Sequence, residues 1–349
     1  MSGREGLRMT RPKDRHSKCT KLLWSDVVPP LLYTLVEGAV LLFLTSATEP
    51  VMPSTTTHVP EAGMAQARLN KVIDLLEQGK VVFGGGMAWT GNIDEAMAFA
   101  DLGYDFVIFE MEHEGFHLPG LRLSLQFLLD RKRIASKGNL QPDVVPFVRV
   151  PPNARERNQW IIKQALDTGI YGLIVPHLDT VEQAQAMVVA SRYPQAVGAP
   201  DTEPVGERGW WYRLAPRYWG LSLPEYYKVA DVWPLDPNGE LFLMPIVEGI
   251  QGVKNLPDIL RNVKGISAIW AGSGDLSIEM GTGGNMSDPR VEEGVQQILK
   301  TCKEFNVPCA TIASPDTIEQ RIEQGFRIIV TMPARVDRTL EMGKRIAGR

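Results

Sequence analysis

Two carboxylates each follow a short apolar segment of this 349-residue chain. Glu248 comes directly after Leu241–Val247, and Asp275 lies shortly after the run at 266–270. Apolar runs of this length, bounded by Gly or Pro, are typical of buried parallel strands, whose carboxyl ends gather ligands at one rim. Two acids brought together there repel each other, and a divalent cation with oxygen ligands relieves that repulsion. The spacing alone equally allows two unrelated acids, one ending a strand and the other capping a helix.

Ionisable side chains also follow other apolar segments. They are Glu110, Glu112 and His113 after the run at 106–109, Arg149 after the run at 144–148, and His177 after the run at 172–175. If these runs are parallel strands of one sheet, their carboxyl ends place acids, imidazoles and a guanidinium at the same rim. Solvated loops would not be expected to place charge so regularly, so this rim is the predicted site of chemistry.

The elements that position these residues begin at Ala65, where amphipathic helices start to alternate with short apolar strands. Eight such units within about 250 residues predict a (β/α)₈ TIM barrel. An open doubly wound sheet is the alternative, but residues 84–86 after the first strand lack the G-x-G-x-x-G spacing. The predicted strands are 81–83, 106–109, 144–148, 172–175, 241–247, 266–270, 307–312 and 327–331. The predicted helices are 65–78, 93–102, 154–168, 181–191, 256–263, 288–305, 315–324 and 336–346.

Bulk composition is that of an ordinary globular protein. The chain is 44% hydrophobic and 22% charged, and its formal net charge of -4 gives no indication of nucleic-acid binding. Its three cysteines show neither paired nor metal-binding spacing. We expect Cys302 and Cys309 to be buried thiols, and a reducing, cytoplasmic location is the simplest fit.

The first 63 residues differ from the rest, and we expect them to form an extension outside a barrel domain of residues 64–349. Residues 1–22 are basic, residues 27–47 are mostly apolar, and residues 49–60 are rich in Pro and Thr. The apolar run resembles a signal peptide or membrane anchor, which would make the protein exported or anchored. Two prolines and a glutamate within the run argue against a membrane role. A third possibility is that translation starts at Met52 or Met64.

Several separated motifs occur in a fixed order between about Ala65 and Gly348. They are Glu112-His113, Pro146-Phe147-Val148-Arg149, ALDTG at 165–169, Val175-Pro176, RYP at 192–194, GERG at 206–209, Val247-Glu248 and GSGDLS at 272–277. Together they resemble the HpcH/HpaI aldolase family of class II pyruvate aldolases, which includes macrophomate synthase. The resemblance implies a phosphoenolpyruvate/pyruvate-type TIM barrel. It also implies cleavage or formation of 4-hydroxy-2-oxo acids from a 2-oxo acid and an aldehyde, with oxaloacetate decarboxylation as a related activity.

The resemblance assigns roles to the residues of this rim. It implies that Glu248 and Asp275 bind a divalent cation, Mg²⁺, Mn²⁺ or Co²⁺, which stabilises the pyruvate enolate as a Lewis acid. Arg149 would face the enolate oxygen. His113 would transfer protons, with Glu112 or Glu110 orienting its ring.

Further residues are expected to complete the pocket. Trp89, after the first strand, is predicted to form a wall, and the backbone of Gly272, Ser273 and Gly274 is predicted to bind the substrate carboxylate. His117 and His177 compete with His113 for the role of base, but His177 lacks acidic neighbours in the sequence.

Three positions depart from the family pattern. Glu110 stands where Asp is common, Ser273 where Pro is common, and Ile246 where Gln is often found. Because these are predicted to be pocket positions, they affect the expected acceptor aldehyde more than the metal step.

An aromatic-rich insertion is predicted at 205–240, without regular structure. Its stretch 209–235 holds four of the eight tryptophans. Such density is typical of interfaces and aromatic-lined pockets, or of a small core beneath a long loop. Because resembling proteins form hexamers, we expect a homo-oligomer in which this stretch forms an interface and one wall of the acceptor pocket.

Two other functions stay open. The first is a citrate-lyase-type acyl-CoA lyase, which would need a basic surface for the cofactor. The second is a catalytically inactive binding barrel, against which the intact set of Arg149, His113, Glu248 and Asp275 argues.

Overall fold

The computed structural model describes residues 67–349, apart from 153, 155–156, 197–202, 212 and 332–337. The predicted extension at 1–63, with its apolar run, lies outside these residues. Within the described part of the chain, we find no helix that combines the length and the apolar character needed to cross a membrane.

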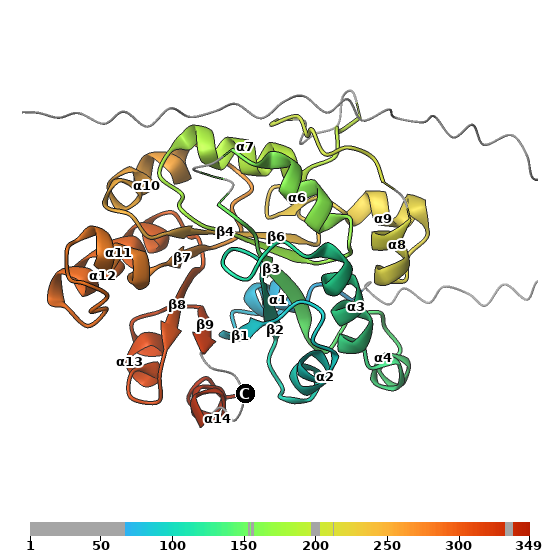
Figure 1. Cartoon of the computed structure of the whole chain (residues 1–349), viewed down its shortest axis with the longest axis horizontal. Coiled ribbons are helices and arrows are strands. Elements are labelled where there is room, and N and C mark those ends of the chain that lie inside the picture. The colour runs from blue at the N-terminus through green and yellow to red at the C-terminus, as the bar shows by residue number, and fades with distance from the viewer. Residues whose placement is uncertain (1–66, 153, 155–156, 197–202, 212, 332–337) are drawn as a thin grey trace, which may run out of the picture. The chain divides into compact units, whose positions relative to one another are not determined.

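Eight parallel strands close into a barrel, as Figure 1 shows. The strands are β1 (Val82–Ala88), β2 (Phe106–Glu110), β3 (Val145–Arg149), β4 (Gly172–Val175), β6 (Leu241–Val247), β7 (Ile269–Ala271), β8 (Cys309–Ala313) and β9 (Ile328–Thr331). Pairing of β4 with β6 completes the ring. All eight predicted strands are present, which confirms the (β/α)₈ barrel. Because every pair is parallel, all the carboxyl ends lie at one rim.

Helices surround the strands (Figure 1). They are α1 (Lys71–Glu77), α2 (Ile93–Asp101), α3 (Leu118–Leu128), α4 (Arg131–Lys137), α6 (Gln159–Leu166), α7 (Val181–Ser191), α8 (Leu214–Trp219), α9 (Leu223–Val229), α10 (Ile250–Asn262), α11 (Ser273–Glu279), α12 (Pro289–Glu304), α13 (Ile318–Glu323) and α14 (Arg338–Ile346). Of the predicted helices, α7 has the predicted bounds. By contrast, α10 begins six residues earlier than expected, which brings its start close to Glu248.

Aromatic rings fill the barrel interior toward the amino ends of the strands. The ring of Phe147 lies 4.7 Å from that of Phe106 and 5.4 Å from that of Phe242. Gly84 and Gly172 leave the room for this packing, because a Cβ on either would lie under 2.5 Å from a phenylalanine ring. All three rings are fully buried, and each contributes roughly 2 kcal/mol through the area removed from water.

Several elements have no counterpart in the sequence-based prediction, and the expected irregular insertion was wrong. The segment between β2 and β3 contains α3 and α4, and the insertion contains α8, α9 and the short strand β5 (Val232–Trp233) rather than irregular chain. Pro119 lies in the first turn of α3, where proline is tolerated. In α4 the side chains are mostly polar, so no apolar periodicity marks the helix.

The aromatic stretch packs mainly at the amino end of the barrel. Trp219 donates its indole N–H to the carbonyl oxygen of Gly169 at 2.8 Å and stacks on Tyr171 at 4.3 Å. Both partners precede β4, whereas the ionisable residues follow the carboxyl ends of the strands. Within one chain this part of the stretch is therefore a satellite core at the amino end of the barrel, and its role in an interface and in a wall of the acceptor pocket stays a prediction. Trp210 and Trp211 are exposed.

Candidate active site

Glu110 is the residue that orders the loop after β2. It ends β2 beside Arg149 of β3, and its carboxylate accepts a hydrogen bond from Arg149 Nε at 2.6 Å. The other oxygen accepts the backbone N–H groups of Glu112 at 2.6 Å and of His113 at 3.1 Å. One buried carboxylate thus fixes both the guanidinium and the loop that carries the predicted base.

Glu112 lies at the centre of the charged side chains. One of its oxygens lies 3.2 Å from Arg149 Nη1 and 3.3 Å from His113 Nε2, while the other lies 3.8 Å from His177 Nε2. Burial raises the pKa of Glu112 above its ordinary value, against the opposing charges of Arg149 and His113. The Glu112 side chain is 6% exposed and that of His113 is 65% exposed, so the pair joins the buried site to solvent.

His177 is a site residue that the sequence analysis ranked too low. It lacks acidic neighbours in the sequence, but the fold brings two acids to it, Glu112 after β2 and Glu248 after β6. The backbone N–H of His177 donates to Glu248 Oε1 at 2.9 Å, and its Nδ1 lies 3.6 Å from the same oxygen. Its φ is +57°, a conformation that a non-glycine residue rarely adopts and that often occurs at functional sites.

Glu248 and Asp275 come together as the strand register predicts. With His177 they form a group whose possible ligand atoms all lie within 4.8 Å of one another. Burial, together with the charges of Asp275 and Glu112, raises the pKa of Glu248 to about 8, against the lowering effect of the His177 backbone N–H and of Arg149. The positive groups of the protein therefore do not fully stabilise the ionised form of Glu248. Two carboxylates and one imidazole are a donor set that suits a divalent cation.

The turn from β7 into α11 approaches Glu248 closely at Gly272. A Cβ on Gly272 would lie 2.6 Å from Glu248 Cβ and 2.7 Å from Ile246 Cγ2. Any side chain here would push α11, and with it Asp275, away from Glu248. A Cβ on Gly274 would meet no atom within 4 Å, so the backbone of Gly274 faces open space.

The other predicted residues lie at the same rim or beside it. Trp89 follows β1 directly, is 58% exposed and donates its backbone N–H to Glu95. Ile246 is buried below Gly272. His117 precedes α3 and packs against Gly120, so its contacts differ from those of the acidic cluster.

Comparison with known proteins gives consistent matches over this barrel. Residues 90–331 match the model of the HpcH/HpaI aldolase/citrate lyase family. A hydroxypyruvate/pyruvate aldolase of Roseobacter denitrificans is 28% identical over 81% of this chain and 98% of its own length. A 4-hydroxy-2-oxo-heptane-1,7-dioate aldolase of Klebsiella pneumoniae is 29% identical over 73% of this chain and 84% of its own. A solved HpcH/HpaI aldolase/citrate lyase family protein from Burkholderia cenocepacia superposes with a TM-score of 0.62 at 25% identity, covering 78% and 96% of the two chains.

Proposed function

The chain belongs to the HpcH/HpaI aldolase/citrate lyase family, and we propose that it is a divalent-cation-dependent aldolase that cleaves or forms 4-hydroxy-2-oxo acids. Pyruvate, or a close 2-oxo acid, would be one fragment and an aldehyde the other. The observation that carries the proposal is the group His177, Glu248 and Asp275, which lies next to the cluster around Arg149. The aldolase names of relatives that span most of the chain support it.

Glu248, Asp275 and His177 are the residues that would hold the cation. When bound, a divalent cation supplies Lewis-acid stabilisation of the charge that develops on the 2-oxo oxygen. The raised pKa of Glu248 supports this fit, because a nearby positive charge would favour its ionised form. The imidazole adds a nitrogen donor, so we propose that Mn²⁺ or Co²⁺ binds more tightly than Mg²⁺.

Arg149 would hold its guanidinium toward the same developing charge. Glu110 and Glu112 both bind it, which fixes the plane of the guanidinium before substrate arrives. In the cleavage direction the C4 hydroxyl loses its proton and becomes the aldehyde carbonyl as the C3–C4 bond breaks. The electron pair of that bond forms the enolate, which then takes up a proton at C3 to give the 2-oxo acid. We assign the proton of the C4 hydroxyl to the His113–Glu112 pair, which can exchange it with solvent through the exposed imidazole. The backbone at Gly272, Ser273 and Gly274 is our candidate for binding the substrate carboxylate.

Oligomer formation is also part of this proposal. Trp210 is 59% exposed and Trp211 43% exposed, and such aromatic side chains are enriched in subunit interfaces. We propose a homo-oligomer, a hexamer, in which these two tryptophans contact a second copy.

Hydrogen exchange of pyruvate tests the central step without knowledge of the aldehyde. The protein is incubated with pyruvate and Mn²⁺ or Mg²⁺ in deuterated water, and loss of the methyl proton signal is followed by NMR. We expect exchange that stops on addition of EDTA and in Glu248→Gln, but not in Glu319→Gln, a matched change at an exposed position of α13. A protein that binds Mn²⁺ yet exchanges no methyl protons would overturn the proposal.

A further inference from the structure

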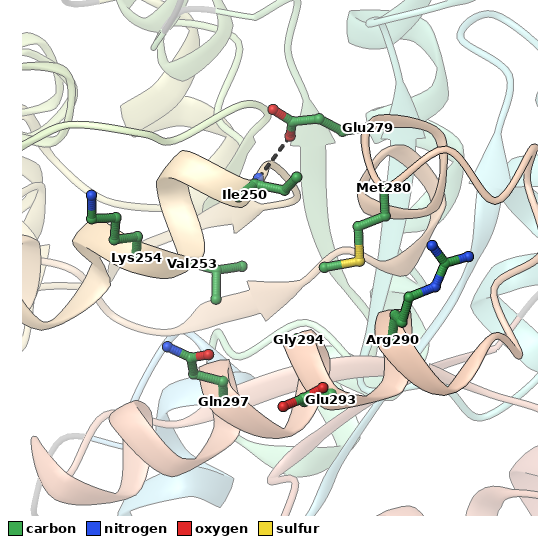
Figure 2. Close-up of a pocket in the computed structure, with 9 residues that line it drawn as sticks. All are labelled: Ile250, Val253, Lys254, Glu279, Met280, Arg290, Glu293, Gly294 and Gln297. Atoms are coloured by element: carbon green, nitrogen blue, oxygen red, sulfur yellow. Dashed lines mark hydrogen bonds between the residues drawn. The ribbon is translucent and has the colours of Figure 1, made fainter.

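Glu279 connects two segments that carry the candidate metal ligands. It is the last residue of α11, and its Oε2 accepts the backbone N–H of Ile250 at 2.7 Å (Figure 2). Ile250 is the first residue of α10, and Gly249 before it has no side chain with which to cap the helix. Since the first N–H groups of a helix lack partners within it, Glu279 supplies from a second helix the acceptor that Gly249 cannot.

The position of this hydrogen bond matters for the site. Glu248 precedes Ile250 by two residues, and Asp275 precedes Glu279 by four, which is one helical turn. At its other end α11 approaches Glu248 through Gly272, as described above. The helix that carries Asp275 is therefore fixed against the Glu248 segment at both ends, by close packing at Gly272 and by the Glu279 hydrogen bond.

The surroundings of Glu279 show that the bond is not part of a packed core. Glu279 is exposed and lies at the edge of an open pocket between α10, α11 and α12, which Val253, Met280 and Gly294 also line (Figure 2). Removing this carboxylate would leave no cavity in the barrel. Its main consequence would be to release the end of α11 from the start of α10.

We propose that Glu279 is a positioning residue for the metal site: through Ile250 N–H it fixes α11, and so Asp275, relative to Glu248. The inference rests on the metal site of the proposed function. Substitution of residues that orient metal ligands without binding the metal commonly lowers metal affinity by about 10- to 100-fold. We therefore expect loss of this bond to weaken Mn²⁺ binding about tenfold while the fold is kept.

A double-mutant cycle on the full chain tests the bond from both sides. Glu279→Ala removes the acceptor. Ile250→Pro removes the donor at a position where proline is tolerated, because it is the first of the helix and Gly249 has the extended conformation that precedes proline (φ -125°, ψ 152°). Mn²⁺ affinity is measured from the electron paramagnetic resonance signal of free Mn²⁺, and the melting temperature reports folding.

We expect each single variant to lose about tenfold in Mn²⁺ affinity, and the double variant to lose no more than either, because both remove one bond. Glu279→Gln, which keeps an acceptor oxygen, should bind Mn²⁺ better than Glu279→Ala. Glu293→Ala, an exposed acid of the same pocket, should bind like wild type. Unchanged affinity in folded single variants, or losses that multiply in the double variant, would overturn the inference and leave the proposed function intact. Wild-type protein that binds no Mn²⁺ would overturn both.

Discussion

His177 contacts Glu248 at two points: its backbone N–H donates a hydrogen bond to Oε1 at 2.9 Å, and its Nδ1 lies 3.6 Å from the same oxygen. The first contact requires the turn after β4 to face the end of β6. The second requires the ring to point into the rim rather than to solvent, and the left-handed backbone of His177 allows both at once. A residue held in this costly conformation beside a buried acid is a strong candidate for a metal ligand.

We predict that His177 sets the preference among cations. His177→Asn should keep the backbone, because asparagine adopts positive φ more readily than most residues, but it removes the imidazole nitrogen. Calorimetric titration should show a loss in Co²⁺ affinity of about tenfold or more, with a smaller change for Mg²⁺, which favours oxygen ligands. His113→Asn is the matched control, since His113 lies outside the group of possible ligands. Equal losses for both cations would argue against a nitrogen ligand.

Glu248 was predicted to be a metal ligand, whereas His177 was ranked behind His113 as a site residue. The difference shows how far the sequence could predict this site. Glu248 and Asp275 each follow an apolar run, so strand register alone places them at one rim. His177 has acids as partners only in space: Glu248 lies 71 residues away in the sequence, and local composition carries no record of the contact. The same limit applies to Glu279, whose partner on α10 could not be named before the two helices were placed.

The aromatic insertion shows a second limit. Its composition fits an interface and a small core equally well, because interfaces and small cores both bury tyrosine and tryptophan rings, which carry one polar group each. The fold separates the two uses, since Trp219 is buried against Tyr171 and Trp210 is left exposed. The helices α8 and α9 were not predicted because each is short and contains a proline.

We predict that Arg149 acts on the rate rather than on cation binding. Arg149→Lys keeps the charge but loses the planar fork that meets both Glu110 and Glu112. If the guanidinium faces the developing oxyanion, the rate constant of pyruvate methyl exchange should fall roughly 100-fold, with Mn²⁺ affinity within a few-fold of wild type. Arg321→Lys alters a similar two-bond pair with Glu292 on the outer helices and should leave the rate unchanged. A rate unaffected by Arg149→Lys would remove Arg149 from the mechanism.

We predict that two exposed tryptophans hold subunits together. Trp210→Ser with Trp211→Ser should lower the molar mass measured by light scattering from that of an oligomer toward that of one chain, because exposed aromatic area is lost from the interface. Deleting the whole stretch is a poorer test, since it would also remove the buried Trp219. Trp160→Ser, at another exposed tryptophan that contacts Phe116, is the control. An oligomer that survives the double substitution would place the interface elsewhere.

We predict that Asp105 contributes an acid-sensitive part of the stability, at the amino end of the barrel and away from the site. Asp105 is fully buried and accepts hydrogen bonds from both Arg349 Nη atoms, at 2.6 and 2.8 Å, and from the backbone N–H of Phe83. Burial by itself raises its pKa, but these bonds and the charge of Lys71, at 3.1 Å, outweigh burial and place the pKa below the ordinary value of 3.8.

Because the folded pKa is the lower one, the carboxylate stabilises the fold fully above its unfolded pKa, and this contribution disappears as pH falls through the folded value. Asp105→Asn should therefore cost about 3 kcal/mol in the free energy of unfolding at pH 7, as for a broken buried ion pair. The difference from wild type should shrink below about pH 4. Urea unfolding at several pH values measures both effects, with Asp258→Asn, in an exposed pair with Arg261, as the control expected to cost under about 1 kcal/mol. A difference between Asp105→Asn and wild type that stays constant down to about pH 3 would show that the ionised carboxylate is not what Arg349 and Lys71 stabilise.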